Sequence, residues 1–140
     1  MERTIRFRVW TGKWFITDDF YIDQYGQIGE LVETGGYSSY RYFESKNGWV
    51  LNQFTGLKDK NGKGIYEGDI VQFKMMTQNL EILKIAEVKY NEKLCGFEPM
   101  CLVNDIDDSF YSIEIQDIVI IGNIHENYEL LKNRSNKENG

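Results

Sequence analysis

Residues 53–71 read QFTGLKDKNGKGIYEGDIV, and this stretch decides the fold. Asn61-Gly62 is the dipeptide preferred in two-residue β-hairpin loops, because asparagine and glycine tolerate the two positive φ angles that such a loop needs. Gly68-Asp69 is a second turn signal, and the run IVQF after it favours a strand. The stretch therefore predicts a tight reversal near residues 60–63 and a strand over residues 70–74.

The residues before this stretch have the pattern of an antiparallel β-meander. Residues 4–10 alternate in polarity, as expected of a strand with one buried face. Further short apolar and aromatic runs are separated by glycine-bearing turns. They predict strands over residues 14–16, 20–22, 31–32, 37–43 and 49–51, with turns at Gly12, around Gly26 and Gly29, and at Asn47-Gly48.

The residues after the central stretch also favour strands. Residues 80–90 have apolar side chains at most even positions, which is the period of a strand, while Leu83 and Ile85 leave a short helix as the alternative. Residues 110–115 and 118–121 are β-branched and aromatic runs, and these residue types pack well on a pleated sheet. Residues 96–103 form one more extended segment. We therefore expect strands to continue through most of the second half.

The end of the chain combines a helical signal with a polar tail. Asn127 stands as a possible N-cap before Glu129, which predicts one short helical turn within residues 126–131. Residues 132–140 are polar and cannot bury apolar surface, so they predict a disordered tail.

Three segments carry a family resemblance. The central stretch resembles the signature of the YopX family, which typically reads QYTGLKDKNGKEIYEGDIV, and it departs from it at Phe54 and Gly64. Residues 5–10, IRFRVW, resemble the family's opening IKFRAW. Residues 121–131, IGNIHENYELL, resemble its closing IGNIYENPELL, with His125 and Tyr128 in place of the usual tyrosine and proline.

The resemblance implies a biological setting rather than an activity. YopX proteins are small proteins encoded by bacteriophages and by prophages of Gram-positive bacteria, and their function is uncharacterised, so no catalytic residue is carried over. The positions that match the signature are expected to be structural. They are Thr55, Gly56, Leu57, Asp59, Asn61, Gly62, Tyr66, Gly68, Asp69, Gly122 and Asn123.

We expect a mainly β chain with two parts. Residues 1–52 form an antiparallel β-meander, and residues 53–131 form a small SH3-like β-barrel that ends in one short C-terminal helical turn. The barrel follows partly from the resemblance and partly from the turn-then-strand pattern at Gly68-Asp69. A length of 140 residues suits one domain or two small sub-domains.

Composition narrows the classes of partner. A formal net charge of -6 and a pI near 4.8 oppose non-specific binding to nucleic acid, whose affinity grows with the phosphates that Lys and Arg neutralise. The N-terminus lacks the pattern of a signal peptide, and no apolar run is long enough to span a membrane. We therefore expect a protein of the host bacterial cytoplasm with no membrane partner.

Several familiar sites are incomplete. The glycines of residues 56–64 miss the phosphate-loop spacing by one residue, and Gly64 stands where Ser or Thr would bind magnesium. Asp105, Asp107 and Asp108 start like a calcium loop, but the required glycine and bidentate glutamate do not follow.

The residues of zinc and thiol sites are also too few. His125 is the only histidine, which excludes a zinc site with several imidazoles. The spacing of Cys95 and Cys101 fits neither a redox pair nor a zinc module, and we expect buried free thiols. We predict no catalytic residue, no cofactor and no metal.

One binding signal remains, in the first half of the chain. Aromatic residues and arginines alternate there, and both types anchor protein interfaces or stack on bases. The alternative is that most of these rings fill the core of the meander. The interface candidates are Arg6, Arg8, Trp10, Trp14, Tyr37, Tyr40, Arg41 and Tyr42, and Trp49 belongs to the same aromatic group.

Our first hypothesis is a non-enzymatic phage or prophage accessory protein that binds proteins. The partners are a host or phage protein and a second copy of the chain, in a symmetric homo-oligomer that uses the edge strands of the N-terminal half. The alternative is a nucleic-acid-associated module that uses the barrel face. An enzymatic function would need an unfamiliar active site.

Overall fold

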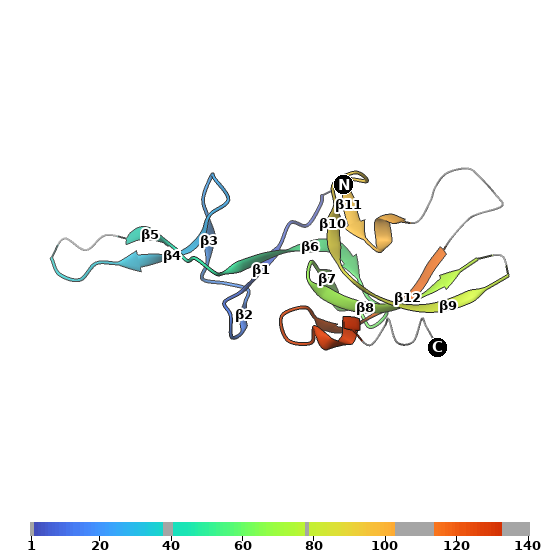
Figure 1. Ribbon diagram of the computed structural model, residues 1–140. Helices are drawn as coiled ribbons and strands as arrows, with labels where there is room; N and C mark the ends of the chain where they lie inside the picture. The colour runs from blue at the N-terminus through green and yellow to red at the C-terminus, as the bar shows by residue number, and fades with distance from the viewer. Residues whose placement is uncertain (1, 38–40, 78, 103–113, 133–140) are drawn as a thin grey trace. The chain divides into compact units, whose positions relative to one another are not determined.

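The computed structural model in Figure 1 describes residues 2–37, 41–77, 79–102 and 114–132. Strands dominate these residues and pair antiparallel throughout, which confirms the prediction of a mainly β chain. The elements are β1 (Phe7–Trp10), β2 (Phe15–Ile16), β3 (Tyr21–Ile22), β4 (Ile28–Glu33), β5 (Arg41–Ser45), β6 (Val50–Lys58), β7 (Gly64–Tyr66), β8 (Asp69–Met76), β9 (Glu81–Glu87), β10 (Lys89–Asn91), β11 (Gly96–Glu98), the 3-10 helix η1 (Met100–Leu102) and β12 (Glu114–Asn123).

The chain divides into two compact units. One unit is Arg6–Gln53, and the other comprises Phe54 to the C-terminus together with the residues before Arg6. The division falls one residue after the boundary that the sequence suggested. Strand β6 contributes to both units, since its first residues pair with β1 and its later residues pair with β7.

The strands of the Arg6–Gln53 unit belong to two small sheets. Strand β1 lies between β2 and the start of β6, and β4 lies between β3 and β5. The turn predicted around Gly29 is wrong at that residue, because Gly29 lies within β4 and pairs with Ser45. The ring of Phe43 packs over Gly29, where a Cβ atom would collide with it. An aromatic ring over a strand glycine replaces the contacts that the missing side chain would make.

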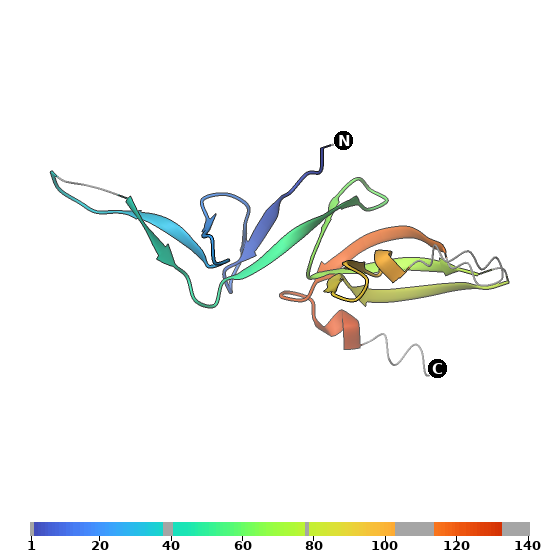
Figure 2. The same ribbon diagram turned by 90° about the horizontal axis from the view of Figure 1, so that it is seen from above.

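The second unit holds most of the core. Strand β8 is the centre of the sheet β12-β8-β9, and β12 curves alongside β8 in Figure 2. Ile65, Val71, Phe73 and Val88 form the buried cluster, and partly buried side chains from β9, β11 and β12 pack against it. The described strands of this unit form open sheets. Their hydrogen bonds therefore do not close into the SH3-like barrel that the sequence predicted.

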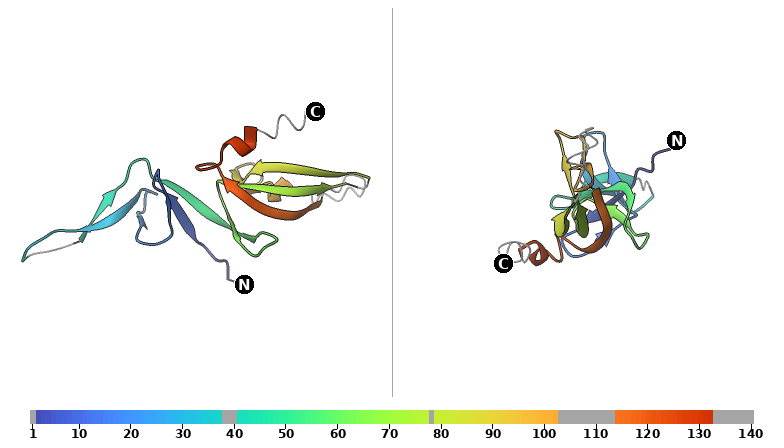
Figure 3. Two further views of the ribbon diagram at one scale, coloured as in Figure 1. Left: turned by 90° about the horizontal axis from the view of Figure 1, so that it is seen from below. Right: turned by 90° about the vertical axis from the view of Figure 1, so that its right-hand side faces the viewer.

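Strand β12 replaces two shorter strands that the sequence predicted. It runs from Glu114 to Asn123, with a bulge between Gln116 and Val119 where Asp117 takes a φ of 53°. A bulge lets one strand continue although its pattern of apolar residues changes phase. Figure 3 shows β12 as one curved strand beside β8, with β9 on the other side of β8. The predicted residues 110–113 lie outside the described part.

Of two other predicted strands, one is divided in two and one is shortened. The segment 80–90 is interrupted at Val88, whose N–H donates to the carbonyl of Asp69 at 2.8 Å. Val88 belongs to neither β9 nor β10, and its carbonyl accepts from the N–H of Gly68 at 2.8 Å. The segment 96–103 ends as a strand at Glu98, where a cis peptide bond to Pro99 precedes η1.

The predicted C-terminal helical turn is confirmed, over residues 129–132. The side chain of Asn127, the predicted N-cap, accepts a hydrogen bond from the N–H of Asn123 at 3.3 Å, while its carbonyl accepts from Leu130 at 3.0 Å. Lys132 belongs to this turn and not to the tail. Residues 133–140 lie outside the described part.

Candidate functional site

The signature stretch forms a hairpin loop between β6 and β7. The N–H of Asp59 donates to the carbonyl of Lys63 at 2.8 Å, and the N–H of Gly62 donates to the carbonyl of Asp59 at 3.0 Å. Gly62 has a φ of 84°, whereas Asn61 is not among the residues with positive φ. The predicted reversal is therefore present, but it is a three-residue loop with one left-handed glycine rather than the expected two-residue loop.

Asp59 holds this loop and also ties it to β12. One oxygen of its carboxylate accepts from the N–H groups of Asn61 and Lys63, each at 2.9 Å, and the other accepts from Ile120 at 3.1 Å. Asp59 is only 7% exposed. Burial by itself raises the pKa of the carboxyl, but the three N–H bonds and the charge of Lys63 outweigh burial and leave the pKa lowered. The carboxylate thus stays ionised and bonded.

Gly62→Val is expected to lower the free energy of unfolding by about 1–2 kcal/mol, because a β-branched residue is strained at positive φ. Gly62→Ala should be milder, since the space around Gly62 is open and only the backbone is strained. Urea unfolding measures both. Gly35→Ala is the matched control, because Gly35 also has open space but no positive φ. A Gly62→Val variant as stable as the parent would refute the strained loop.

The segment Thr55-Gly56-Leu57 is a bulge in β6. The ladder shifts register between Phe54, which pairs with Tyr66, and Lys58, which pairs with Gly64. Gly56 has a φ of 88°, and the hydroxyl of Thr55 accepts from the N–H of Leu57 at 3.2 Å. These three signature residues therefore bend the strand before the hairpin loop.

Gly68 and Asp69 join three strands at the other end of the hairpin. The carboxylate of Asp69 accepts from the N–H of Tyr66 at 2.8 Å, which closes the turn between β7 and β8. The N–H of Gly68 donates to Val88, and its carbonyl accepts from Ile124, both at 2.8 Å. One residue thus links the ends of β9 and β12.

Gly122 and Asn123 lock the turn that follows β12. The side-chain oxygen of Asn123 accepts from the N–H groups of His125 and Glu126, at 3.0 and 2.9 Å. A Cβ atom on Gly122 would lie 2.7 Å from the side-chain oxygen of Asn127, so only glycine fits there. The matched signature residues bond mainly to backbone groups of their own unit, which is a structural role.

The aromatic and arginine candidates of the first half separate into two groups. Arg8 and Trp10 are engaged within the unit, because the guanidinium of Arg8 lies 4.2 Å from the ring of Phe15 and the ring of Trp10 lies 5.0 Å from the same ring. Other candidates are exposed, and Tyr40 lies outside the described residues. The exposed ones are Arg6, Trp14, Tyr37, Arg41 and Tyr42.

These exposures bear on the alternative that most of the rings fill a core. Trp14 is 60% exposed and Tyr42 is 42% exposed, so these rings are not core residues of the unit. In the described part of Arg6–Gln53, Val9 is the only buried apolar side chain. The meander thus presents several of its large rings to solvent.

A hollow of about 440 Å³ lies within the Arg6–Gln53 unit. It combines two tryptophans with three carboxylates and one lysine. The lining residues are Thr11, Lys13, Trp14, Ile16, Asp18, Asp19, Glu30 and Trp49. Of these, the sequence pointed only to the tryptophans, because the acidic residues lie on a separate turn and strand and have no motif spacing.

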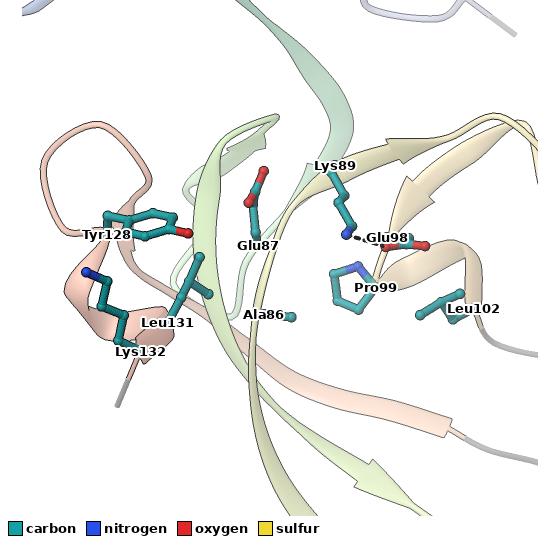
Figure 4. A pocket seen from close by; sticks show the side chains of 9 residues that line it. All are labelled: Ala86, Glu87, Lys89, Glu98, Pro99, Leu102, Tyr128, Leu131 and Lys132. Carbon is teal, nitrogen blue, oxygen red and sulfur yellow. Dashed lines mark ion pairs between the residues drawn. The ribbon is translucent and has the colours of Figure 1, made fainter. Parts of the chain in front are cut away.

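A second hollow of about 490 Å³ lies within the other unit, in the size range of small-molecule sites. Figure 4 shows the residues that line it, from the β9–β10 segment, the β11–η1 segment and the C-terminal helical turn. The ammonium of Lys89 lies 3.8 Å from the carboxylate of Glu98, and the ammonium of Lys132 lies 5.7 Å from the centre of the Tyr128 ring.

The lining of this second hollow offers little for catalysis. Two lysines and two glutamates balance its charge, and its nine residues include no serine, cysteine or histidine. Glu98 is already held by the side chain of Asn91 at 2.7 Å. The groups present can bind a small polar ligand, but they do not pair a nucleophile with a base.

The cysteines are free but not equally covered. Burial raises the pKa of the Cys101 thiol, and the charge of Glu98 raises it further, so the thiol stays protonated and a poor nucleophile. Cys95 is exposed and Cys101 is half-buried, so the prediction of buried thiols is wrong for Cys95 and only partly met by Cys101. It sits on the turn before β11 with a φ of 52°.

Within the described ranges, no three His, Cys, Asp or Glu side chains gather as a metal site would require. Asp105, Asp107 and Asp108 lie outside those ranges. The described part of the chain also contains no helix that is long and apolar enough to cross a membrane.

Comparison with known proteins identifies a family and a fold. A protein-family profile described as YopX protein matches residues 6–132. A solved structure, the crystal structure of protein EF1440 from Enterococcus faecalis, is similar over 93% of this chain and 99% of its own, with a TM-score of 0.56 and 24% identity. No curated protein matches the chain.

Proposed function

Because the chain belongs to the YopX family, we propose that it is a non-enzymatic phage or prophage accessory protein that acts by binding proteins, including a second copy of itself. The observation that supports this proposal is the exposed apolar surface of the Arg6–Gln53 unit. Its exposed large apolar side chains are Trp14, Tyr21, Ile22, Tyr25, Leu31, Tyr37, Tyr42 and Val50.

A unit of this size needs more burial than it has. Domains of fewer than about 60 residues are marginal even when most of their apolar surface is buried. Among the described residues of this unit, Val9 is the only apolar side chain that is fully buried. Binding another protein would remove the exposed rings from water and stabilise the unit.

One face of the β3-β4-β5 sheet suits such an interface. Tyr21 pairs with Gly29 and Leu31 pairs with Phe43, so these side chains lie on the same face. Tyr21 and Leu31 are exposed. Aromatic and aliphatic side chains side by side on a sheet are the composition expected at an interface core.

The charge of the unit favours protein over nucleic acid as a partner. Arg6–Gln53 holds five basic residues against six acidic residues, so it has no excess of positive charge to neutralise phosphates. Arg8 is also engaged by Asn52, which accepts from its Nε at 3.4 Å. A nucleic-acid-associated module remains the competing function in the test.

Size-exclusion chromatography with light scattering is expected to give a dimer or larger oligomer at roughly 100 μM chain. Leu31→Glu should return the mass to that of a monomer, because it places a charge in the centre of the proposed face. Gln24→Glu is the matched control, since Gln24 is exposed and lies outside the strands of that sheet.

Two results would contradict the proposal. The first is a monomer mass for the unchanged protein at that concentration. The second is tight binding of a fluorescent single-stranded oligonucleotide, measured by anisotropy, with a steep dependence on salt. The second result would favour the nucleic-acid-associated module.

A further inference from the structure

The hollow of the Arg6–Gln53 unit has an aromatic wall. The N–H of Trp14 donates to the hydroxyl of Thr11 at 3.3 Å, and the carbonyl of Trp14 accepts from the N–H of Thr11 at 3.0 Å. These bonds hold the turn between β1 and β2. Trp49 joins the lining from the segment before β6. Two indole rings from separate turns therefore border one cavity.

The same cavity has an acidic wall, in which two carboxylates have no partner among the described residues. Glu30 already forms an ion pair with Lys46, with 3.0 Å between oxygen and nitrogen. Asp18 and Asp19 are exposed, and neither forms a hydrogen bond or ion pair with another described residue. Lys13 is the one cation in the lining. The hollow thus carries an excess of negative charge next to two tryptophans.

This combination selects a cation as ligand. A guanidinium or ammonium group is attracted by the face of a tryptophan ring, and most strongly where carboxylates also reach it. An anion would be repelled by Asp18 and Asp19. A purely apolar group would remove these carboxylates from water without a partner, which costs free energy.

We propose that the hollow bordered by Trp14 and Trp49 is a binding site for an arginine side chain presented by a protein partner. The inference rests on the proposed function, since it gives the chemistry of the partner that the unit binds. Arginine is favoured over lysine because its planar group can stack on an indole ring while it donates two hydrogen bonds to one carboxylate. Arginine is also enriched at the energetic centres of protein interfaces.

The test uses the indole N–H signals of the three tryptophans in ¹⁵N-labelled full-length protein. The probe is Nα-acetyl-arginine methylamide, and the neutral analogue with citrulline in place of arginine is the control ligand. The arginine probe should shift the Trp14 and Trp49 signals in a saturable way. Trp10 packs against Phe15 and lies outside the hollow, so its signal should move much less.

Variants separate charge from fold. Asp18→Asn with Asp19→Asn should weaken the arginine probe about ten-fold or more, since each lost ion pair removes part of the attraction. Asparagine also tolerates the φ of 57° at position 19. Glu33→Gln, an exposed residue outside the hollow, should bind the probe as the parent does. Trp14→Leu should lose binding, with amide spectra checking that each variant is folded.

Three results would overturn the inference: equal shifts from the citrulline analogue, equal movement of all three indole signals, or no saturation by the arginine probe. Light scattering on the same samples separates this inference from the proposed function. A protein that self-associates but ignores the arginine probe refutes the site alone. A protein that binds the probe but remains a monomer supports the site and contradicts the self-association.

Discussion

Replacing Asp59 by alanine is expected to lower the free energy of unfolding of its unit by about 3–5 kcal/mol. The change removes one carboxylate that accepts from three backbone N–H groups, those of Asn61, Lys63 and Ile120. The position is nearly closed to water, so replacement hydrogen bonds from solvent are limited. Asp59→Asn should cost less, because the amide keeps one acceptor oxygen. Guanidinium chloride unfolding, followed by far-UV circular dichroism, measures both.

The control is Glu81→Ala, which removes an acidic side chain from an exposed ion pair with Lys74 in the same unit. Exposed pairs contribute about 0–1 kcal/mol, so this variant should unfold close to the parent. If Asp59→Ala were no less stable than Glu81→Ala, the three N–H bonds would not support the fold.

Low pH should remove the contribution of the Asp59 carboxylate to stability. Because folding holds the pKa of Asp59 below its ordinary value of 3.8, its contribution to stability is complete above that value. The contribution is lost as the pH falls through the lowered pKa of the folded state. The difference in unfolding free energy between parent and Asp59→Asn should therefore shrink below about pH 4. A difference that stays constant down to pH 2 would contradict this assignment.

Gly29→Ala is the second substitution with a large expected effect, about 3 kcal/mol or more. A Cβ atom at Gly29 would overlap the carbonyl of Glu44 on the neighbouring strand and the ring of Phe43. The carbonyl cannot withdraw without breaking the β4–β5 ladder, so the pairing should open. Amide hydrogen exchange in β4 and β5 is the direct measurement, and protection there should be lost.

Gly35→Ala is the matched control for that experiment. It belongs to the same unit, but an added Cβ atom would meet nothing within 4 Å and its φ is not positive. This variant should keep the exchange protection of the parent. Equal protection in Gly29→Ala would show that the two strands do not approach as closely as their carbonyl and ring positions indicate.

Local signals in the sequence predicted much of the fold. Gly62 and Gly68 lie at reversals of the chain, as their turn signals predicted. Glycine favours such positive φ angles by itself, without the help of distant contacts. The alternation of residues 4–10 found strand β1, although the paired part begins only at Phe7. The mainly β class follows from such short-range patterns.

Other features depend on partners far away in the chain. In the sequence, Gly29 resembles a turn residue. The structure shows instead that it is a strand residue covered by the ring of Phe43. The bulge at Asp117 merges two apolar runs into β12, and nothing in the residues themselves marks the change of phase. The fold brings Asp18 and Asp19 to the hollow that Trp14 also lines, and no spacing in the sequence predicts this. Pair contacts of this kind have no signature in a single sequence.

The two departures from the family signature illustrate the same point. Phe54 and Gly64 are ten positions apart in the stretch, but a Cβ atom at Gly64 would lie 2.9 Å from the ring of Phe54. The ring and the missing side chain therefore occupy one place between β6 and β7. The sequence shows two separate departures, while the structure places them against each other across the β6–β7 hairpin.

The bond between Asp59 and Ile120 also orders events during synthesis of the chain. It joins residues 61 positions apart, and the neighbouring bond from the N–H of Lys60 to the carbonyl of Ile118 spans a similar distance. A ribosome releases the hairpin loop long before it releases β12, and contacts so distant in sequence form slowly because a long loop must first close. The most recognisable stretch of the chain thus reaches its final bonding only after β12 has emerged, and until then Asp59 holds only its own loop.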